Sequence, residues 1–183
     1  KDAPSSQNLK RLQALPPNVL TQKALFEGNN NPGWLSLLDG AGYFNSPPPS
    51  EEKLDDEKAV NAFHWPAAEY LTGLASSDDA EVQGKVLEIV QRIPKTDNVW
   101  VNRELINIAK ALPVEQSVQF YSKIEESIDA LKGGVFLRDV ADVVKFWAEN
   151  GQGKKALTLA KSLLFLEDGE GDLEEKSKFR EDY

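Results

Sequence analysis

Apolar residues in the second half of the chain recur at the spacing of an amphipathic helix. Five stretches carry apolar positions at i, i+3, i+4 and i+7, and none alternates as a half-buried strand does. They lie at residues 79–93, 98–112, 114–131, 136–149 and 153–166. On the third, the expected apolar face runs from Val114 to Leu131, and on the fourth it comprises Leu137, Val140, Ala141, Val144, Trp147 and Ala148. The pattern predicts successive helices and no sheet.

Turn-forming residues stand where these stretches end. Ser77 or Asp78 is the expected N-cap of the helix at 79–93, since a short polar side chain accepts hydrogen bonds from the first turn. Pro94 follows that helix, and Pro113 stands where another must begin. Glycines at 133–134 and 151–153 supply the positive φ that tight turns require.

The helices group into pairs. The expected pairs are 66–75 with 79–93, 98–112 with 114–131, and 136–149 with 153–166. Their spacing is close to the roughly 34 residues of tetratricopeptide repeats and the roughly 40 of HEAT or armadillo repeats. The predicted fold is therefore all-α, an α-solenoid of stacked antiparallel helix pairs of the HEAT or TPR kind.

The N-terminal third is less regular. Short helices are expected at 7–15 and 17–26, and a third helix from Trp34 to about Gly40, capped by Asn31. The predicted organisation is one helical repeat domain over residues 1–166, followed by an acidic tail at 167–183. Within the domain, irregular helices occupy 1–45, an acidic and proline-rich connector occupies 46–63, and helix pairs occupy 64–166.

The net charge of −9 is concentrated in two segments. Residues 51–58 contain five acids and two lysines, and residues 167–183 contain eight acids and three bases. These segments sum to −8, so the remaining chain is nearly neutral. We expect residues 2–6, the connector at 50–61 and the tail beyond about 169 to be mobile or held by local contacts only. The scattered bases argue against nucleic-acid binding, which needs a continuous basic surface.

The composition of the chain bears on its compartment and on the kinds of site that it can form. The chain has no cysteine, which excludes disulfides and thiolate zinc sites and fits a cytoplasmic protein. No apolar run reaches the roughly 20 residues of a membrane span, so no membrane role is expected. The chain also lacks methionine, and we interpret it as a fragment of a longer polypeptide or as a chain with unnatural ends.

Several short blocks resemble a known arrangement. They are Asn31-Pro32-Gly33-Trp34-Leu35, Gly42-Tyr43-Phe44 with the prolines at 47–49, the run from Trp65 to Leu71, and Thr96-Asp97-Asn98. In this order they resemble a HEAT-like helical-repeat segment near the N-terminus of large, poorly characterised bacterial multidomain proteins. The resemblance covers residues 17–115. It implies a helical repeat region attached to other domains, and it implies no activity.

Candidate chemistry is sparse. His64 is the only histidine, and beside Trp65 and Pro66 we interpret it as a packed or capping residue. We predict no catalytic residue, no metal and no cofactor. The aromatic residues around the proline segment could form a peptide-docking groove or close the open end of the repeat stack, and we favour the structural interpretation. They are Trp34, Tyr43, Phe44, Trp65 and Tyr70.

Three classes of function remain. The preferred one is a non-catalytic module that binds a protein partner or other domains of its parent chain. The alternatives are an enzyme with a carboxylate site assembled in the fold, for example around 55–57, and a HEAT-like nucleic-acid-binding protein. For the preferred function we expect the binding surface on 79–93, 114–131 and 153–166. The candidate exposed contacts there are Gln83, Gln91, Gln116, Gln119 and Lys123.

Overall fold

The computed structural model describes residues 4–14, 19–53, 60–62, 64–131 and 136–164. Its helices confirm the all-α class. In order, they are α1 (Ser6–Gln13), α2 (Val19–Phe26), the 3-10 turn η1 (Pro32–Trp34), α3 (Leu35–Gly40), α4 (Pro66–Ala75), α5 (Ala80–Arg92), α6 (Val99–Ala111), α7 (Val114–Ser117), the 3-10 turn η2 (Val118–Phe120), α8 (Tyr121–Leu131), α9 (Leu137–Glu149) and α10 (Gly153–Leu163). The expected acidic tail lies outside the described residues.

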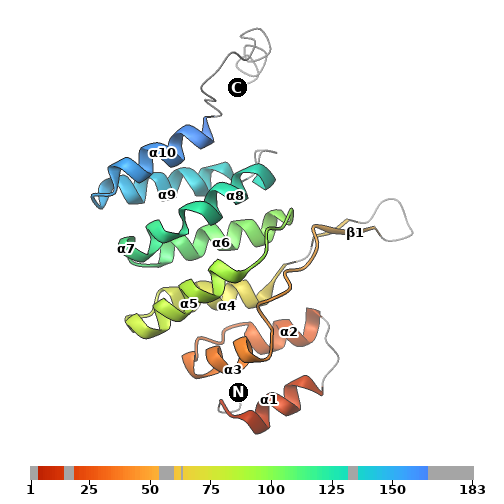
Figure 1. Ribbon diagram of the computed structural model, residues 1–183. Coiled ribbons are helices and arrows are strands. Elements are labelled where there is room, and N and C mark those ends of the chain that lie inside the picture. Colours follow the sequence, from red (N-terminus) through yellow and green to blue (C-terminus); the bar gives the residue numbers. More distant parts are fainter. Residues whose placement is uncertain (1–3, 15–18, 54–59, 63, 132–135, 165–183) are drawn as a thin grey trace.

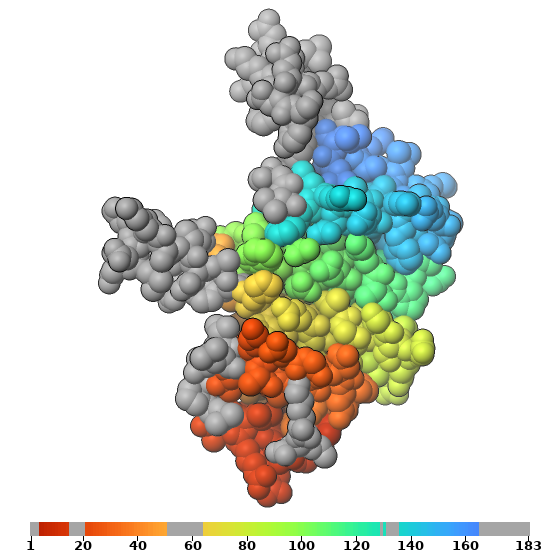
Figure 2. Space-filling model, turned by 180° about the vertical axis from the view of Figure 1, so that it is seen from behind, coloured from red at the N-terminus to blue at the C-terminus, as the bar shows by residue number. Residues whose placement is uncertain are grey.

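The helices follow one another from one end of an elongated molecule to the other (Figure 1). Helices α4, α6 and α9 contact one another in turn, while α5 packs on α4, α8 on α6 and α10 on α9. Helix α10 also contacts α8, and α2 contacts α4 at the N-terminal side. The space-filling view shows the same order as successive bands of colour (Figure 2).

One hydrophobic core runs through these helices. Its largest fully buried side chains include Trp147, Tyr70, Phe44 and Phe120. The apolar stripe that the 3.6-residue period predicts on α6 is buried throughout, and it comprises Val101, Leu105, Ile108, Ala109 and Leu112. Val86, Ile89 and Val90 on α5 are also buried. Periodicity therefore identified the inward sides of these two helices correctly.

Aromatic side chains attach the N-terminal helices to α4. Phe26 lies 5.5 Å from Tyr70 and 6.4 Å from Phe44 between ring centroids. The Tyr70 hydroxyl donates to the Asn31 carbonyl at 2.8 Å. Trp34 and Trp65 are each 3% exposed. These residues belong to the core, as the structural interpretation of the aromatic cluster predicted.

An ion-pair group connects α3 to α5. Asp39, whose side chain is 12% exposed, accepts from Arg92 at 2.8 Å and lies 3.2 Å from Lys85. The pair spans 53 positions in sequence. It holds the irregular N-terminal region against the first of the longer helices.

The expectation of no sheet is wrong in one segment. Strands β1 (Glu51–Lys53) and β2 (Val60–Ala62) form an antiparallel ribbon in the acidic connector, with Glu51 opposite Ala62 and Lys53 opposite Val60. A ribbon of this length forms from backbone hydrogen bonds and needs no apolar periodicity, so the pattern gave no sign of it.

The helix predicted at 114–131 is interrupted. The 3-10 turn η2 separates α7 from α8, and both Val118 and Phe120 are buried. Two residues two positions apart point about 160° apart on an α-helix, but only about 120° apart on a 3-10 helix. The tighter turn therefore helps both side chains to reach the core.

Two finer predictions also need correction. The N-cap of α5 is Asp79, which accepts from the amides of Glu81 and Val82, whereas the Ser77 hydroxyl accepts from the Asp79 amide. On α9 the buried residues are Val140, Val143 and Trp147, while Ala141 and Ala148 are exposed. Alanine suits both sides of a helix, so it marks the buried side poorly.

A buried polar network joins α6, α7 and α9. Trp147 Nε1 donates to Ser117 Oγ at 2.7 Å, and that hydroxyl donates to the carbonyl of Ala109. The residue four positions after Ala109 is Pro113, which has no amide hydrogen to continue the helical bonding. Ser117 therefore satisfies a carbonyl that the proline leaves open, and it is itself fully buried.

We predict that Ser117→Ala destabilises the protein by about 1–3 kcal/mol, because it leaves the buried indole N–H and the Ala109 carbonyl without a partner. The melting temperature should fall by about 2–4 °C for each kcal/mol in a chain of this length. Urea and thermal unfolding measure the change. The control is Ser122→Ala on the exposed side of α8. Equal stability of the two variants would contradict the role given to the network.

Candidate functional site

Three aromatic rings form a continuous row across the beginnings of α4, α6 and α9. The imidazole of His64 stacks on Trp100 with 4.9 Å between centroids, and Trp100 lies 5.2 Å from Phe136. We call His64, Trp100 and Phe136 the aromatic ladder. The His64 side chain is 52% exposed, and the other two residues are half-buried. The ladder therefore presents aromatic surface outside the core.

Each ring lies at or just before the N-terminal end of a helix. Asn98 caps α6, because its side-chain oxygen accepts from the amides of Trp100 and Val101 at 2.9 and 3.3 Å. Phe136 is the residue before the first turn of α9, and His64 precedes the N-cap residue of α4 by one position. The rings thus stand at matching ends of three helices that pack side by side.

Charged residues border the ladder toward α9. The Arg103 guanidinium lies over the Phe136 ring, 4.6 Å from its centroid, and its Nε donates to Asp139 at 3.2 Å. Further along the same two helices, Lys110 of α6 pairs with Asp142 of α9 at 3.1 Å. The Lys110 ammonium lowers the pKa of the Asp142 carboxyl. The polar contacts between α6 and α9 are therefore between opposite charges.

Toward α4 the border is acidic. Glu69 accepts from His64, with 3.1 Å between Oε1 and Nδ1. Glu104 accepts from two neutral donors, Thr72 at 3.1 Å and Asn107 at 3.3 Å. Burial raises the pKa of the Glu104 carboxyl, and the nearby Glu69 charge raises it further. Glu69 of α4 thus lies near enough to Glu104 of α6 for its charge to act on that carboxyl.

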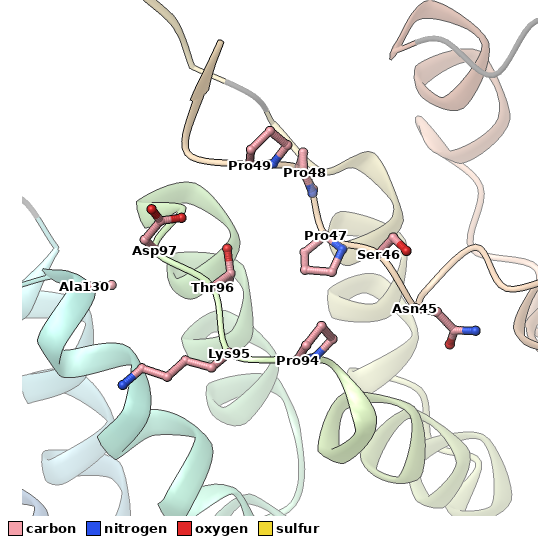
Figure 3. A pocket seen from close by; sticks show the side chains of 10 residues that line it. All are labelled: Asn45, Ser46, Pro47, Pro48, Pro49, Pro94, Lys95, Thr96, Asp97 and Ala130. Carbon is pink, nitrogen blue, oxygen red and sulfur yellow. The ribbon is translucent and has the colours of Figure 1, made fainter. Parts of the chain in front are cut away.

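A separate groove follows the proline segment (Figure 3). It has a volume of about 740 Å³ and lies between the prolines at 47–49 and the loop at 94–97, with Ala130 of α8 at its edge. Asn98 ties the two walls together, because its amide donates to the carbonyls of Pro48 and Pro49 at 3.2 and 2.8 Å. Asp97 also accepts from Ser50 at 3.1 Å. The groove is built on contacts that hold the connector to α6.

The residues expected to contact a partner divide into two groups. Gln91 and Gln119 are exposed, as predicted. Gln83, Gln116 and Lys123 are half-buried, so the prediction that they are exposed is wrong. Gln83 donates to the Ser77 carbonyl, Lys123 donates to the Ile93 carbonyl at 2.7 Å, and Gln116 Oε1 is buried. Long polar side chains reach back to carbonyls at helix ends, which periodicity does not reveal.

The ladder itself was missed by the sequence patterns, although its members are evenly spaced. His64, Trp100 and Phe136 are 36 residues apart, close to the length of one repeat. His64 stacks on Trp100 but remains half exposed, so its expected packing is correct only in part. The carboxylates considered for catalysis at 55–57 lie outside the described residues.

The described residues contain neither a group of side chains that could hold a metal ion nor a helix that could span a membrane. No group of three or more histidine, cysteine, aspartate or glutamate side chains in this part of the chain is arranged to hold a metal ion. None of the described helices is long and apolar enough to cross a membrane. Comparison of the chain with known protein families, curated proteins and solved structures finds no match.

We predict that Asn98→Ala lowers the free energy of unfolding by about 2–3 kcal/mol, because one side chain supplies both the α6 cap and the bonds to the proline carbonyls. Asn98→Ser retains a capping oxygen but cannot donate two amide hydrogens to Pro48 and Pro49. The serine variant should therefore lose about half as much free energy of unfolding, as measured by urea unfolding. Asn45→Ala, at an exposed position of the same groove, is the control. A serine variant as unstable as the alanine variant would show that the connector bonds carry the whole effect.

We predict that Glu104→Gln stabilises the protein at pH 7. The folded state raises the pKa of Glu104, so it binds the proton more tightly than the unfolded state does and stability rises as pH falls. The glutamine variant lacks this term, and its advantage over the unmodified protein should shrink between pH 7 and pH 4. Thermal unfolding over this range measures it, with the exposed Glu149→Gln as control. An advantage that does not change with pH would contradict the assignment.

Proposed function

We propose that this chain is a non-catalytic helical-repeat module that binds a protein partner or another domain of a larger bacterial protein. In this proposal its helices form an α-solenoid of stacked antiparallel pairs in the HEAT or TPR manner. The module works in the cytoplasm by presenting a fixed surface, and it needs no cofactor.

The packing of the helices supports the repeat architecture. Helices α4, α6 and α9 would be the first members of three pairs, and α5, α8 and α10 the second members. Each first member contacts the next one along the chain, and α8 contacts α10. Contacts of this kind, between neighbouring units only, are typical of repeat proteins.

The aromatic ladder is the observation that carries the proposed binding role. Tryptophan and arginine are enriched where interfaces derive most of their affinity. Trp100 and Arg103 lie three positions apart on α6, and both contact the ring of Phe136. The rings are fixed by stacking, so little side-chain entropy is lost when a partner covers them. We therefore place the binding surface on α4, α6 and α9 in preference to the side with Gln91 and Gln119.

Charge supports a protein partner over nucleic acid. Glu69 and Glu104 border the ladder toward α4, while toward α9 Asp139 and Asp142 are paired with Arg103 and Lys110. The whole chain carries a net charge of −9. Phosphate groups bind where lysine and arginine predominate. An acidic border of this kind repels them.

The proposal predicts that Trp100→Leu strongly weakens partner capture. The protein is immobilised and exposed to an extract of its own organism, and bound proteins are identified by mass spectrometry. Loss of a central tryptophan should weaken capture by roughly thirtyfold, which corresponds to about 2 kcal/mol. The matched comparison is Gln91→Glu with Gln119→Glu, which alters the other side of the molecule and should leave capture unchanged.

Circular dichroism first establishes that each variant is folded. If only the variant with Gln91→Glu and Gln119→Glu loses capture, the binding surface lies on α5 and η2 instead. A metal- or nucleotide-dependent turnover by the purified protein would contradict the non-catalytic proposal itself.

A further inference from the structure

The two halves of the aromatic ladder differ in what occupies them. At Phe136 a cation of the protein itself lies on the ring, since the Arg103 guanidinium is 4.6 Å from the centroid and bonds to Asp139. At Trp100 the neighbouring ring is His64, and the adjacent carboxylates are Glu69 and Glu104. The first half shows the arrangement of a cation, a ring and a carboxylate. The second half supplies the ring and two carboxylates.

The positions of these carboxylates relative to Trp100 follow from the helices. Glu104 lies four residues after Trp100 on α6, so the two side chains occupy neighbouring positions on the same side. Glu69 bonds to His64, which stacks on Trp100. Both carboxylates therefore border the indole, one on α6 and one across the contact with α4.

Among the described residues, their negative charge has little local compensation. Toward α9, Arg103 pairs with Asp139 and Lys110 with Asp142, and Arg138 lies one turn before Asp142. Toward α4, the hydrogen-bond donors to Glu69 and Glu104 are His64, Thr72 and Asn107. Arg103 lowers the pKa of Glu104 only as the smallest of several contributions. The excess charge on this surface is thus concentrated beside Trp100.

Both carboxylates have capacity for further donors. An ionised carboxylate offers about four acceptor positions. Glu104 uses two of them in the described contacts, and Glu69 uses one. The Glu69 side chain is 48% exposed, so a donor from outside can reach it.

We propose that the aromatic ladder binds an arginine-bearing segment of the partner protein, with the guanidinium stacked on the Trp100 indole and donating to Glu69 and Glu104. This inference rests on the proposed function and specifies the partner's chemistry. A guanidinium suits the site because it is planar, stacks on aromatic rings and donates in several directions at once. Lysine offers the same charge without the planar stack, so it should bind more weakly.

The test uses the whole chain and fluorescein-labelled seven-residue peptides, Gly-Ser-Arg-Gly-Arg-Ser-Gly and its lysine and citrulline counterparts. Fluorescence anisotropy at low salt gives the dissociation constants. We expect the arginine peptide to bind several times more tightly than the lysine peptide. Citrulline, which retains the shape of arginine without its charge, should bind at least tenfold more weakly.

Variants locate the site. Glu69→Gln with Glu104→Gln should weaken binding of the arginine peptide by about five- to tenfold, because two charge-assisted bonds are lost. Glu88→Gln with Glu149→Gln changes the net charge equally at exposed positions on α5 and α9 and should leave binding within twofold. Trp100→Phe should retain most of the affinity, whereas Trp100→Leu should lose about fivefold.

Equal binding of the arginine and citrulline peptides, or equal effects of the two glutamine pairs, would overturn the inference. Capture of a protein that depends on Trp100 but not on Glu69 and Glu104 would also overturn it, while leaving the proposed function in place. If none of the peptides binds and capture of proteins does not depend on Trp100, the proposed function is contradicted as well.

Discussion

The short helices of this protein cannot cover their apolar sides alone, and this constraint governs the arrangement of the chain. Helix α6 shows it most clearly, because it contacts α4, α8 and α9. Its predicted stripe is buried, and so are Asn102 and Ile106, which lie outside that stripe. A helix buried from several directions cannot be removed without exposing its neighbours. Stability in such a stack therefore arises between helices more than within them.

Prolines that end the helices leave carbonyls without amide partners, and polar side chains from later helices occupy several of them. Ser117 donates to Ala109, four residues before Pro113. Lys123 of α8 donates to the carbonyl of Ile93, immediately before Pro94. Lys155 of α10 donates in the same way to the carbonyl of Val118 in η2, where no proline ends the helix. Each bond links a helix to an element that precedes it in the chain. The turns are thus fixed by contacts that local sequence does not encode.

The difference between regular apolar burial within helices and polar contacts between them explains what the sequence could predict. A period of 3.6 residues identified α5, α6, α9 and α10, because apolar burial repeats regularly along each of them, and α4 was predicted as the partner of α5 in the first pair. It missed η2, where Val118 and Phe120 are buried out of period, and the ribbon at 51–53 and 60–62, which depends on backbone pairing. The ladder also escaped notice, since no pattern within a single helix joins His64, Trp100 and Phe136. Residues 36 positions apart become neighbours only after the helices pack.

The central ring of the ladder, Trp100, lies in the first turn of a helix that is capped by a side chain. Asn98 holds the first turn of α6 through two amides, and the same side chain fixes the proline segment, so the Trp100 backbone is restrained from two directions. The indole itself is restrained by His64, which stacks on it, and by Phe136, whose ring is tilted against it. A surface ordered before binding loses less entropy when a partner arrives, and a small number of contacts can then give useful affinity. The buried amide of Asn98 thereby links the stability of the stack to the geometry of its exposed rings.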